Sequence, residues 1–216
     1  MNKLNQLGIT IKKNKKAEVV FNSLQPDFTK VIYKNPSEYI NIYWEAYKKH
    51  PQNNNNQNGR IFEFILATLF VREGLLPLFL CAKVAFVPNV TYDLMFYTAE
   101  LGPICISAKT SLRERYKQAD LEAIALKYVH RKAQTYLITL DESAAIGVKA
   151  KIKRGDVIGI DNVIVATSFE FDELILKLKS FEYSESPTIK VIHSTQIITV
   201  EKVQNLKYPL LNSCSK

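Results

Sequence analysis

The chain has 216 residues, of which 47% are apolar and 23% charged, as expected for a soluble globular protein with one domain or one domain and a small appendage. Its 29 Lys and Arg residues outnumber its 21 Asp and Glu residues, which gives a formal net charge of +8. That balance suits a phosphate backbone or an anionic lipid, although proteins that bind neither also carry it.

Several classes of protein are disfavoured by the cysteine and apolar patterns. The three cysteines lie far apart and form no Cys-x-x-Cys pair, so we expect reduced buried thiols rather than a disulfide framework or a zinc site: Cys81, Cys105 and Cys214. The longest apolar run, near residues 74–87, is shorter than the roughly 20 residues that span a bilayer. The first 16 residues lack the apolar core of a signal peptide. We therefore expect a cytoplasmic protein with no membrane partner.

The first 58 residues are predicted to form a basic arm followed by a helical region. Residues 1–16 carry a cluster of four lysines and are expected to be mobile, either solvated or lying along phosphates. Residues 17–50 have a helical pattern that prolines interrupt near positions 26 and 36. Tyrosines recur there at helical spacing, from Tyr39 to Tyr47, as core residues or dimer contacts. The polar stretch 51–58 marks a boundary, so we divide the chain into 1–58 and a core of 59–216 within one compact domain.

The core alternates apolar helices and strands. Residues 59–73 are predicted to form a buried helix, and two strands at 91–97 and 104–108 are expected to be antiparallel neighbours because their connection is short. The remaining predicted strands are 78–87, 136–140, 163–167 and a late pair in 188–200, and the remaining helices are 111–130, 142–152 and 171–181. This order predicts an α/β fold with a central mixed sheet and helices on both faces.

An aspartate and a lysine stand at the ends of the two neighbouring strands. Asp93 begins the first strand and Lys109 ends the second, so a favourable register brings them to one edge of the sheet. A divalent metal held by carboxylates there would neutralise charge on a phosphodiester and activate water. Taken singly, Asp93 also suits a turn and Lys109 a solvated strand end.

Two glutamates on predicted helices extend this constellation. Glu63 interrupts an apolar helix face, where a carboxylate must be paired, neutralised or metal-bound. Its alternatives are to turn to solvent or to pair with Arg60 or Lys83. Glu122 lies on a largely apolar helical stripe and has an alternative pairing with Lys127 or Arg131.

These residues resemble the motif of the PD-(D/E)XK nuclease superfamily. The resemblance rests on Gly-Arg-Ile-Phe-Glu at 59–63, Tyr92-Asp93, and a strand that ends in Ser107-Ala108-Lys109. Tyr92 stands where the family has proline, and Ser107 stands where it has its second acid. The resemblance implies that Asp93, Lys109 and Glu63 are catalytic.

A subgroup of type II restriction endonucleases, the EcoRII-like and CCGG-cutting enzymes, shares the missing second acid. In that subgroup a glutamate on the following helix replaces it, and Glu122, thirteen residues past Lys109, is similar to that glutamate. The subgroup also has an Arg-(Asp/Glu)-Arg motif that reads bases, which Arg113-Glu114-Arg115 resembles. Arginine can donate to guanine O6 and N7, and glutamate can accept from cytosine N4. A serine cap at Ser111 is expected to start the helix that presents them.

The resemblance implies a Mg²⁺-dependent type II restriction endonuclease that cuts double-stranded DNA at a site containing CC and GG and leaves 5′-phosphate ends. Asp93 and Glu122 would bind Mg²⁺. A homodimer, with an interface around Tyr39–Tyr47, and a cognate methyltransferase in the host are further implications. The alternatives are a catalytically inactive DNA-binding protein on the same fold, which Ser107 favours, and a repair or junction-resolving nuclease.

Overall fold

A computed structural model describes residues 2–11, 15–185 and 191–206. Its centre is a seven-stranded mixed sheet with the order β5-β4-β3-β2-β1-β6, and β7 also pairs with β1. The strands are β1 (Leu78–Val84), β2 (Tyr92–Thr98), β3 (Gly102–Lys109), β4 (Gln134–Thr139), β5 (Asn162–Val165), β6 (Ile192–His193) and β7 (Gln196–Ile198).

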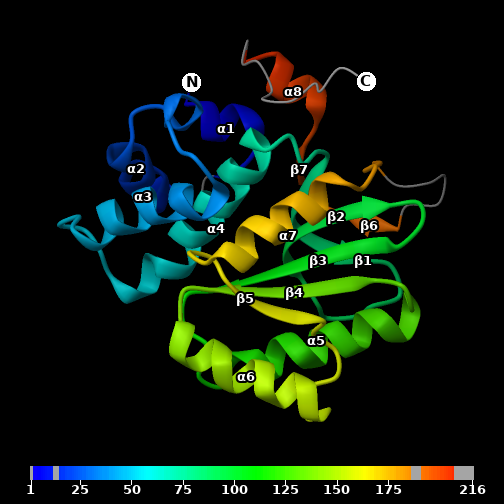
Figure 1. The fold of residues 1–216 in the computed structure, drawn as a ribbon. Helices are drawn as coiled ribbons and strands as arrows, with labels where there is room; N and C mark the ends of the chain where they lie inside the picture. Colours follow the sequence, from blue (N-terminus) through cyan, green and yellow to red (C-terminus); the bar gives the residue numbers. More distant parts are fainter. Residues whose placement is uncertain (1, 12–14, 186–190, 207–216) are drawn as a thin grey trace.

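Helices cover both faces of this sheet (Figure 1). They are α1 (Lys3–Leu7), α2 (Lys15–Leu24), the 3₁₀ helix η2 (Phe28–Lys30), α3 (Pro36–Lys48), α4 (Asn55–Arg72), α5 (Arg115–Val129), α6 (Glu142–Arg154), α7 (Phe169–Lys179) and α8 (Val200–Gln204). Helices α4 and α7 share one apolar cluster with one face of the sheet, whereas α5 and α6 pack on the other. The predicted α/β fold is confirmed. None of the described helices combines the length and apolar character needed to cross a bilayer.

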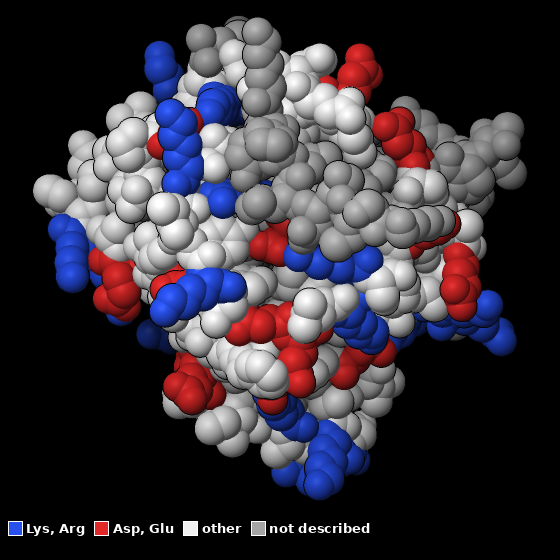
Figure 2. All heavy atoms as spheres, turned by 45° about the horizontal axis from the view of Figure 1, so that its top comes forward, with Lys and Arg blue, Asp and Glu red and all other residues white. Residues whose placement is uncertain are grey.

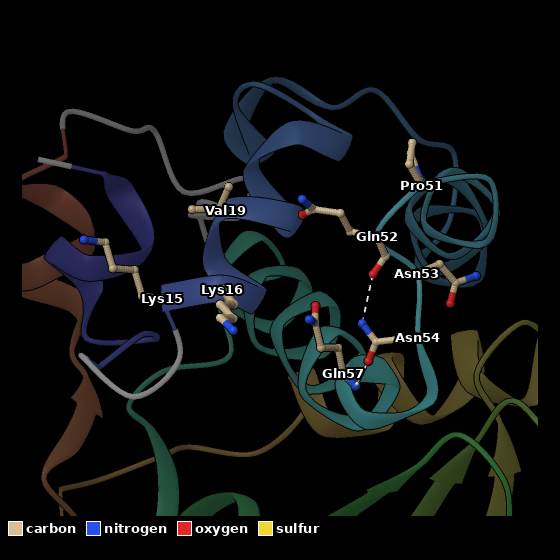
Figure 3. Close-up of a pocket in the computed structure, with 8 residues that line it drawn as sticks. All are labelled: Lys15, Lys16, Val19, Pro51, Gln52, Asn53, Asn54 and Gln57. Carbon is tan, nitrogen blue, oxygen red and sulfur yellow. Dashed lines mark hydrogen bonds between the residues drawn. The ribbon is translucent and has the colours of Figure 1, made fainter.

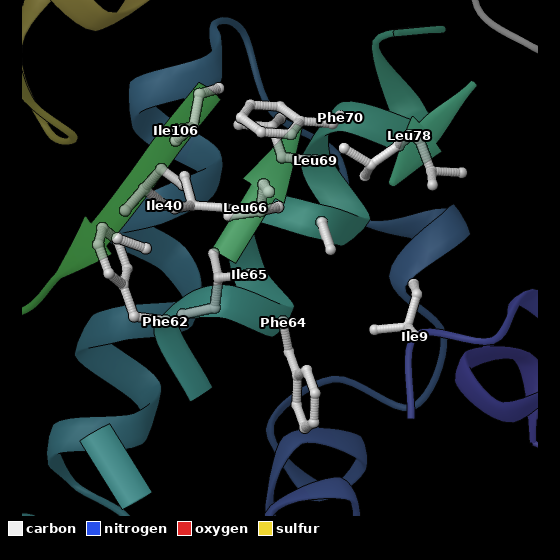
Figure 4. Packing of buried hydrophobic residues seen from close by; sticks show 14 of the residues in the cluster. Ile9, Ile40, Phe62, Phe64, Ile65, Leu66, Leu69, Phe70, Leu78 and Ile106 are labelled. Atoms are coloured by element: carbon white, nitrogen blue, oxygen red, sulfur yellow. The ribbon is translucent and has the colours of Figure 1, made fainter. Parts of the chain in front are cut away.

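Helix α4 forms the centre of the larger core. Its apolar side chains between positions 61 and 71 are buried, among them Phe62, Leu66 and Phe70, and Figure 4 shows several of them packed near Ile106 of β3 and Ile9. The helix begins at Asn55, because the Asn54 side chain caps it by accepting from the Gln57 N–H. Its first turn therefore lies inside the polar stretch predicted as a boundary loop.

The N-terminal segment packs onto this core instead of forming a mobile arm. Leu4, Leu7 and Ile9 are almost completely buried and belong to the same apolar cluster as α4. The lysines at positions 12 and 13 lie outside the described residues, whereas Lys15 and Lys16 begin α2. Residues 1–58 and 59–216 thus share one core, and α4 runs across the division between them.

The tyrosines of α3 are core residues. Tyr39, Tyr43 and Tyr47 are fully buried. Tyr43 stacks on Phe21 with ring centroids 4.9 Å apart, and the Tyr39 hydroxyl donates to Thr68. Because these rings are enclosed by their own chain, they are core residues, which was one of the two alternatives; a homodimer interface formed by the helices around them stays a prediction.

The pairing of β3 changes along its length. Its antiparallel pairs with β2 run from Thr98↔Gly102 to Leu94↔Ile106, which confirms the predicted hairpin. Its parallel pairs with β4 run from Ile104↔Gln134 to Lys109↔Thr139. The last three residues of β3 therefore form strand pairs with β4 alone, because the backbone of β2 has separated from them.

The C-terminal part differs in detail from the prediction. Of the late pair expected in 188–200, β6 and β7 are the described strands, and both lie antiparallel to β1. Residues 188–190 lie outside the described part of the chain, and Val200 already begins α8, which Thr199 caps.

Candidate functional site

Asp93 and Lys109 meet at the point where β2 and β3 separate. Lys109 Nζ donates to Asp93 Oδ2 at 2.8 Å, and the Ala108 N–H donates to the same oxygen at 2.9 Å. The Asp93 carboxylate thus accepts the hydrogen bond from the Ala108 N–H that a backbone carbonyl of a neighbouring strand would otherwise accept. Both charged side chains are about one-fifth exposed, so the pair is sheltered yet reachable from solvent.

A left-handed residue lies opposite Asp93. Cys81 has φ 47, and the flanking pairs Leu80↔Leu94 and Ala82↔Tyr92 place it across from Asp93. In a regular strand residues two apart point to the same face, but here Leu80 packs in the α4-side cluster and Ala82 in another. Non-glycine residues in this region are strained and concentrate at functional sites.

The cysteines differ in exposure. Cys81 is exposed, which corrects the expectation of a buried thiol. Cys105 is buried as expected, and Cys214 lies outside the described residues.

Glu63 reaches the same place from α4. It lines a small pocket with Asp93, Cys81 and Arg60, and Arg60 donates to its carboxylate at 2.6 Å. Burial, and then the charge of Asp93, raise the pKa of Glu63 to about 7, while Arg60 and Lys109 oppose that shift. The alternative pairing with Arg60 is therefore confirmed, and both partners of this half-exposed pair line the pocket that also holds Asp93.

Glu122 approaches from the opposite face of the sheet, on α5. Burial raises the pKa of Glu122, Asp93 adds to this, and Gln118 and Lys109 oppose it. Gln118 donates to its carboxylate at 2.8 Å. Of the two alternative partners named for Glu122, Lys127 pairs with Asp161 instead, and no ion pair joins Arg131 to Glu122 among the described residues.

Two contacts seat α5 beside the strands that carry the site. The Tyr92 hydroxyl donates to the Glu122 carbonyl oxygen at 3.1 Å. Ser107 lines a small cavity together with Ala119 and Ala123, which lie on the same helix as Glu122. Ser107, which stands where a second acid was expected, thus faces α5, and α5 carries Glu122.

The donors present suit a magnesium ion. Within the described residues, no three His, Cys, Asp or Glu side chains lie close enough together to hold one metal. Mg²⁺ is usually bound by one or two carboxylates, with water and phosphate oxygens completing its shell. Asp93 Oδ1 and Glu122 Oε2 make no hydrogen bond to any residue that the structure describes, so each acid keeps one oxygen for such a ligand.

The Arg113-Glu114-Arg115 triplet is fully on the surface. All three residues are exposed, and Glu114 pairs with Lys117. The helix does not begin at Ser111 as expected: Arg113 has φ 34, which is not helical, and α5 begins at Arg115. The triplet therefore forms the turn into α5 and its first residue.

Sequence reasoning missed three neighbours of the site. Arg60 is part of the quoted 59–63 motif but was considered only as a competing partner of Glu63. Gln118 lies one helical turn before Glu122, a spacing at which side chains meet. Cys81 gave no signal, because composition does not reveal its left-handed backbone conformation.

Charge is mixed over the face of the molecule that Figure 2 shows. Figure 2 shows acidic side chains between the Lys and Arg side chains across one face of the molecule. On that face the net charge of +8 does not collect into one continuous basic patch.

The fold is that of the restriction endonucleases, a mixed sheet with α4 and α5 on opposite faces of the strands that bear Asp93 and Lys109. A solved structure with this fold is Ecl18kI, a restriction endonuclease, described as metal-depleted and in complex with uncleaved, modified DNA. The two superpose with a TM-score of 0.50 over 100% of this chain and 87% of that chain, at 17% sequence identity. No protein-family model and no curated protein matches the sequence.

Proposed function

We propose that this chain is a Mg²⁺-dependent type II restriction endonuclease that hydrolyses phosphodiester bonds of double-stranded DNA at a site containing CC and GG. The observation that carries the proposal is the Asp93–Lys109 pair at the point where β2 and β3 separate. Besides burial, the charges of this pair shift the pKa of Glu63 and of Glu122, so both carboxyl groups lie close enough to interact with it electrostatically. The likeness to a DNA-bound restriction endonuclease supports it.

Each side chain has a role that its surroundings suit. Asp93 and Glu122 would hold Mg²⁺, which supplies positive charge to the phosphate and makes water more acidic. Lys109, fixed by Asp93, positions the attacking water and stabilises the negative charge that develops on the phosphoryl group. Glu63, with its raised pKa, exchanges a proton near neutral pH. Attack of water on phosphorus breaks the bond to the 3′ oxygen, which leaves a 5′-phosphate and a 3′-hydroxyl.

The surface triplet would supply specificity. Arg113 and Arg115 are exposed donors and Glu114 an exposed acceptor, which matches the edges of guanine and cytosine in the major groove. A palindromic site calls for a two-fold homodimer, since protein symmetry mirrors site symmetry. A host that keeps such an enzyme needs a cognate methyltransferase to protect its own DNA.

A plasmid digest tests the proposal. With Mg²⁺ the protein should convert a sequenced plasmid into discrete fragments whose ends map to one short sequence and ligate without prior phosphorylation. EDTA or Asp93→Ala should abolish cutting. Cutting by Asp93→Ala at the wild-type rate would contradict the assignment of the site.

The same digest separates two alternatives. Ser107, in place of an acid, favours an inactive DNA-binding protein on this fold; that protein would retard DNA without cutting it. A repair or junction-resolving nuclease would instead nick branched or damaged DNA and leave an intact duplex alone.

A further inference from the structure

The exposed triplet Arg113-Glu114-Arg115 lies between two buried residues. Leu112, which precedes it, is completely enclosed, and Tyr116, which follows it, is nearly so. Both belong to the apolar cluster that α5 and α6 share with one face of the sheet. The direction in which the triplet faces solvent therefore depends on what holds these two neighbours.

The ends of two parallel strands bring α6 beside this turn. Strands β3 and β4 end in register, at Lys109 and Thr139. The chain reaches Leu112 three residues after β3 and Asp141 two residues after β4, so both lie just beyond the same edge of the sheet. Helix α6 begins there, and Figure 1 shows it side by side with α5.

Asp141 joins the turn to α6. Its Oδ2 accepts from the Leu112 N–H at 3.3 Å, and its Oδ1 accepts from the Ala144 N–H at 3.1 Å, which caps α6. The hydroxyl of Ser143 also donates to Oδ1. The N–H groups of Ala144 and Leu112, and also the charge of Arg113, outweigh burial and lower the pKa of Asp141. One carboxylate thus caps α6 with one oxygen and holds the approach to α5 with the other.

Helix α6 makes a second contact on the far side of the triplet. Lys151 Nζ donates to the Tyr116 hydroxyl at 2.5 Å and lies 4.5 Å from the centroid of its ring, an arrangement in which the ammonium group is attracted to the ring face. The residues on both sides of the triplet are therefore held by α6, which contributes no residue to the proposed site.

The conformation of the triplet needs this support. Arg113 has φ 34, and the left-handed region is disfavoured for a residue with a Cβ. The Arg115 N–H donates to the Leu112 carbonyl oxygen at 2.6 Å and closes the turn over Arg113. Release of Leu112 would let Arg113 leave this conformation and would change the direction of one arginine relative to the other.

We propose that Asp141 is a positioning residue, which aims the Arg113-Glu114-Arg115 turn at base edges and so contributes to sequence discrimination without touching DNA. The inference rests on the proposed function for what the turn reads. The attachment of the turn to Asp141 is measurable without DNA.

The test variant is Asp141→Asn. It keeps the shape of the side chain and one oxygen for the cap, since asparagine and aspartate are equally good N-caps, but its amide group cannot accept from the Leu112 N–H while that oxygen serves Ala144. The matched control, Ser143→Ala, removes another hydrogen bond of the same carboxylate and leaves the turn untouched. Both variants should melt within about 4 °C of wild type, whereas Asp141→Ala, which also loses the cap, should melt lower.

Amide hydrogen exchange followed by NMR gives the first readout. Without DNA, the Leu112 N–H of Asp141→Asn should exchange about three- to tenfold faster than in wild type, as for one lost hydrogen bond, while the Ala144 N–H should exchange at the wild-type rate. Ser143→Ala should match wild type at Leu112. An unchanged rate at Leu112 in Asp141→Asn would overturn the proposal.

Competition between duplexes in EDTA gives the second readout. The preference of Asp141→Asn for the site found by the plasmid digest over single-substitution duplexes should fall about five- to tenfold. Its affinity for a duplex of unrelated sequence should not fall, because phosphate contacts are retained. A merely structural defect would weaken binding to every duplex alike. That result, a wild-type preference in Asp141→Asn, or an equal loss in Ser143→Ala would overturn the proposal.

Failure of the two proposals is distinguishable. A wild-type protein that neither cuts DNA nor prefers any sequence would refute the nuclease assignment, and exchange at Leu112 alone would then decide whether Asp141 holds the turn. A wild-type protein that cuts at one short sequence, with Asp141→Asn equally selective, would refute the positioning role alone.

Discussion

Lys109 Nζ and the Ala108 N–H converge on a single oxygen of Asp93, at 2.8 and 2.9 Å. One carboxylate oxygen thus carries the attachment to β3, and the other stays available to a ligand. This division explains how an acid can be fixed in place by the protein and still coordinate a cation. It also ties the position of the amine to the position of the acid.

Removing the amine should abolish catalysis without loss of DNA binding. Lys109→Ala deletes the group that positions the attacking water, so single-turnover cleavage should slow by about 10²- to 10⁴-fold, with duplex affinity in EDTA within about threefold of wild type. Lys127→Ala breaks an ion pair of similar length with Asp161, outside the site, and should cut normally. Wild-type cleavage by Lys109→Ala would refute its role.

Glu122 should determine the requirement for metal. Glu122→Ala removes one of the two proposed ligands, so the Mg²⁺ concentration for half-maximal cleavage should rise about tenfold or more, as for the loss of a carboxylate ligand. Gln118→Ala removes only the hydrogen bond that holds this carboxylate and should have a smaller effect in the same titration. Equal behaviour of Glu122→Ala and wild type would remove Glu122 from the site.

Glu63 should make the metal-free protein less stable as pH rises. Its folded-state pKa of about 7 lies above the ordinary value of 4.5, so the folded state binds the proton more tightly than the unfolded chain. Its contribution to stability is complete below pH 4.5 and is lost as pH rises to about 7.

Urea denaturation in EDTA at pH 4.5 and 7.5 measures this effect. Between these values the free energy of unfolding of the wild type should fall, relative to Glu63→Gln, by on the order of 1 to 3 kcal/mol. Parallel pH profiles for the two proteins would show that Glu63 titrates normally.

Arg113 should discriminate between sequences. It is exposed on the turn before α5, so Arg113→Ala should fold normally and reduce the preference for the cognate site by about 1–3 kcal/mol for a lost bidentate contact. Competition between cognate and single-substitution duplexes gives this number. An equal loss on all sequences would make Arg113 a phosphate contact.

Gly159 should tolerate no side chain. A Cβ there would lie 2.4 Å from the Asp120 carbonyl oxygen and 2.7 Å from the Ile124 nitrogen, both backbone atoms of α5. Gly159→Ala should therefore destabilise the protein by about 1–3 kcal/mol. Gly147→Ala, in α6 with nothing within 4 Å of its Cβ, should stabilise it by about 0.5–1 kcal/mol. Thermal melts distinguish them, and equal melting temperatures would contradict the close approach.

The order of the elements was predictable because each apolar run had one compatible structure. The hairpin of β2 and β3 followed from its short connection, whereas the meeting of Asp93 with Lys109 depended on a register that the sequence permits but does not fix. The extent of α4 was not predictable, because an asparagine-rich stretch suits a loop unless the side chain of Asn54 caps a helix.

Tertiary contacts decided the other outcomes. Burial of Tyr39 and Tyr43 depends on α2 and α4 closing over α3, which helical spacing alone cannot separate from a dimer face. The start of α5 moved to Arg115 because Arg113 adopts a left-handed conformation, and no nearby glycine announces it. An open pocket beside Lys15 (Figure 3) is built from segments about 40 residues apart in the sequence, so no local pattern marks it.

The last residues of β3 form strand pairs on one side only, where Lys109 lies beside Thr139 of β4, and on the other side they contact the Asp93 carboxylate. Thr139 is completely buried and distant in sequence from every acid of the site. Any loosening of β4 would leave this end of β3 attached through the Asp93 carboxylate alone, while the rest of the hairpin stays paired. Inactivation by mild heat or denaturant should therefore precede global unfolding. It should begin with β4, although β4 contributes no reacting group.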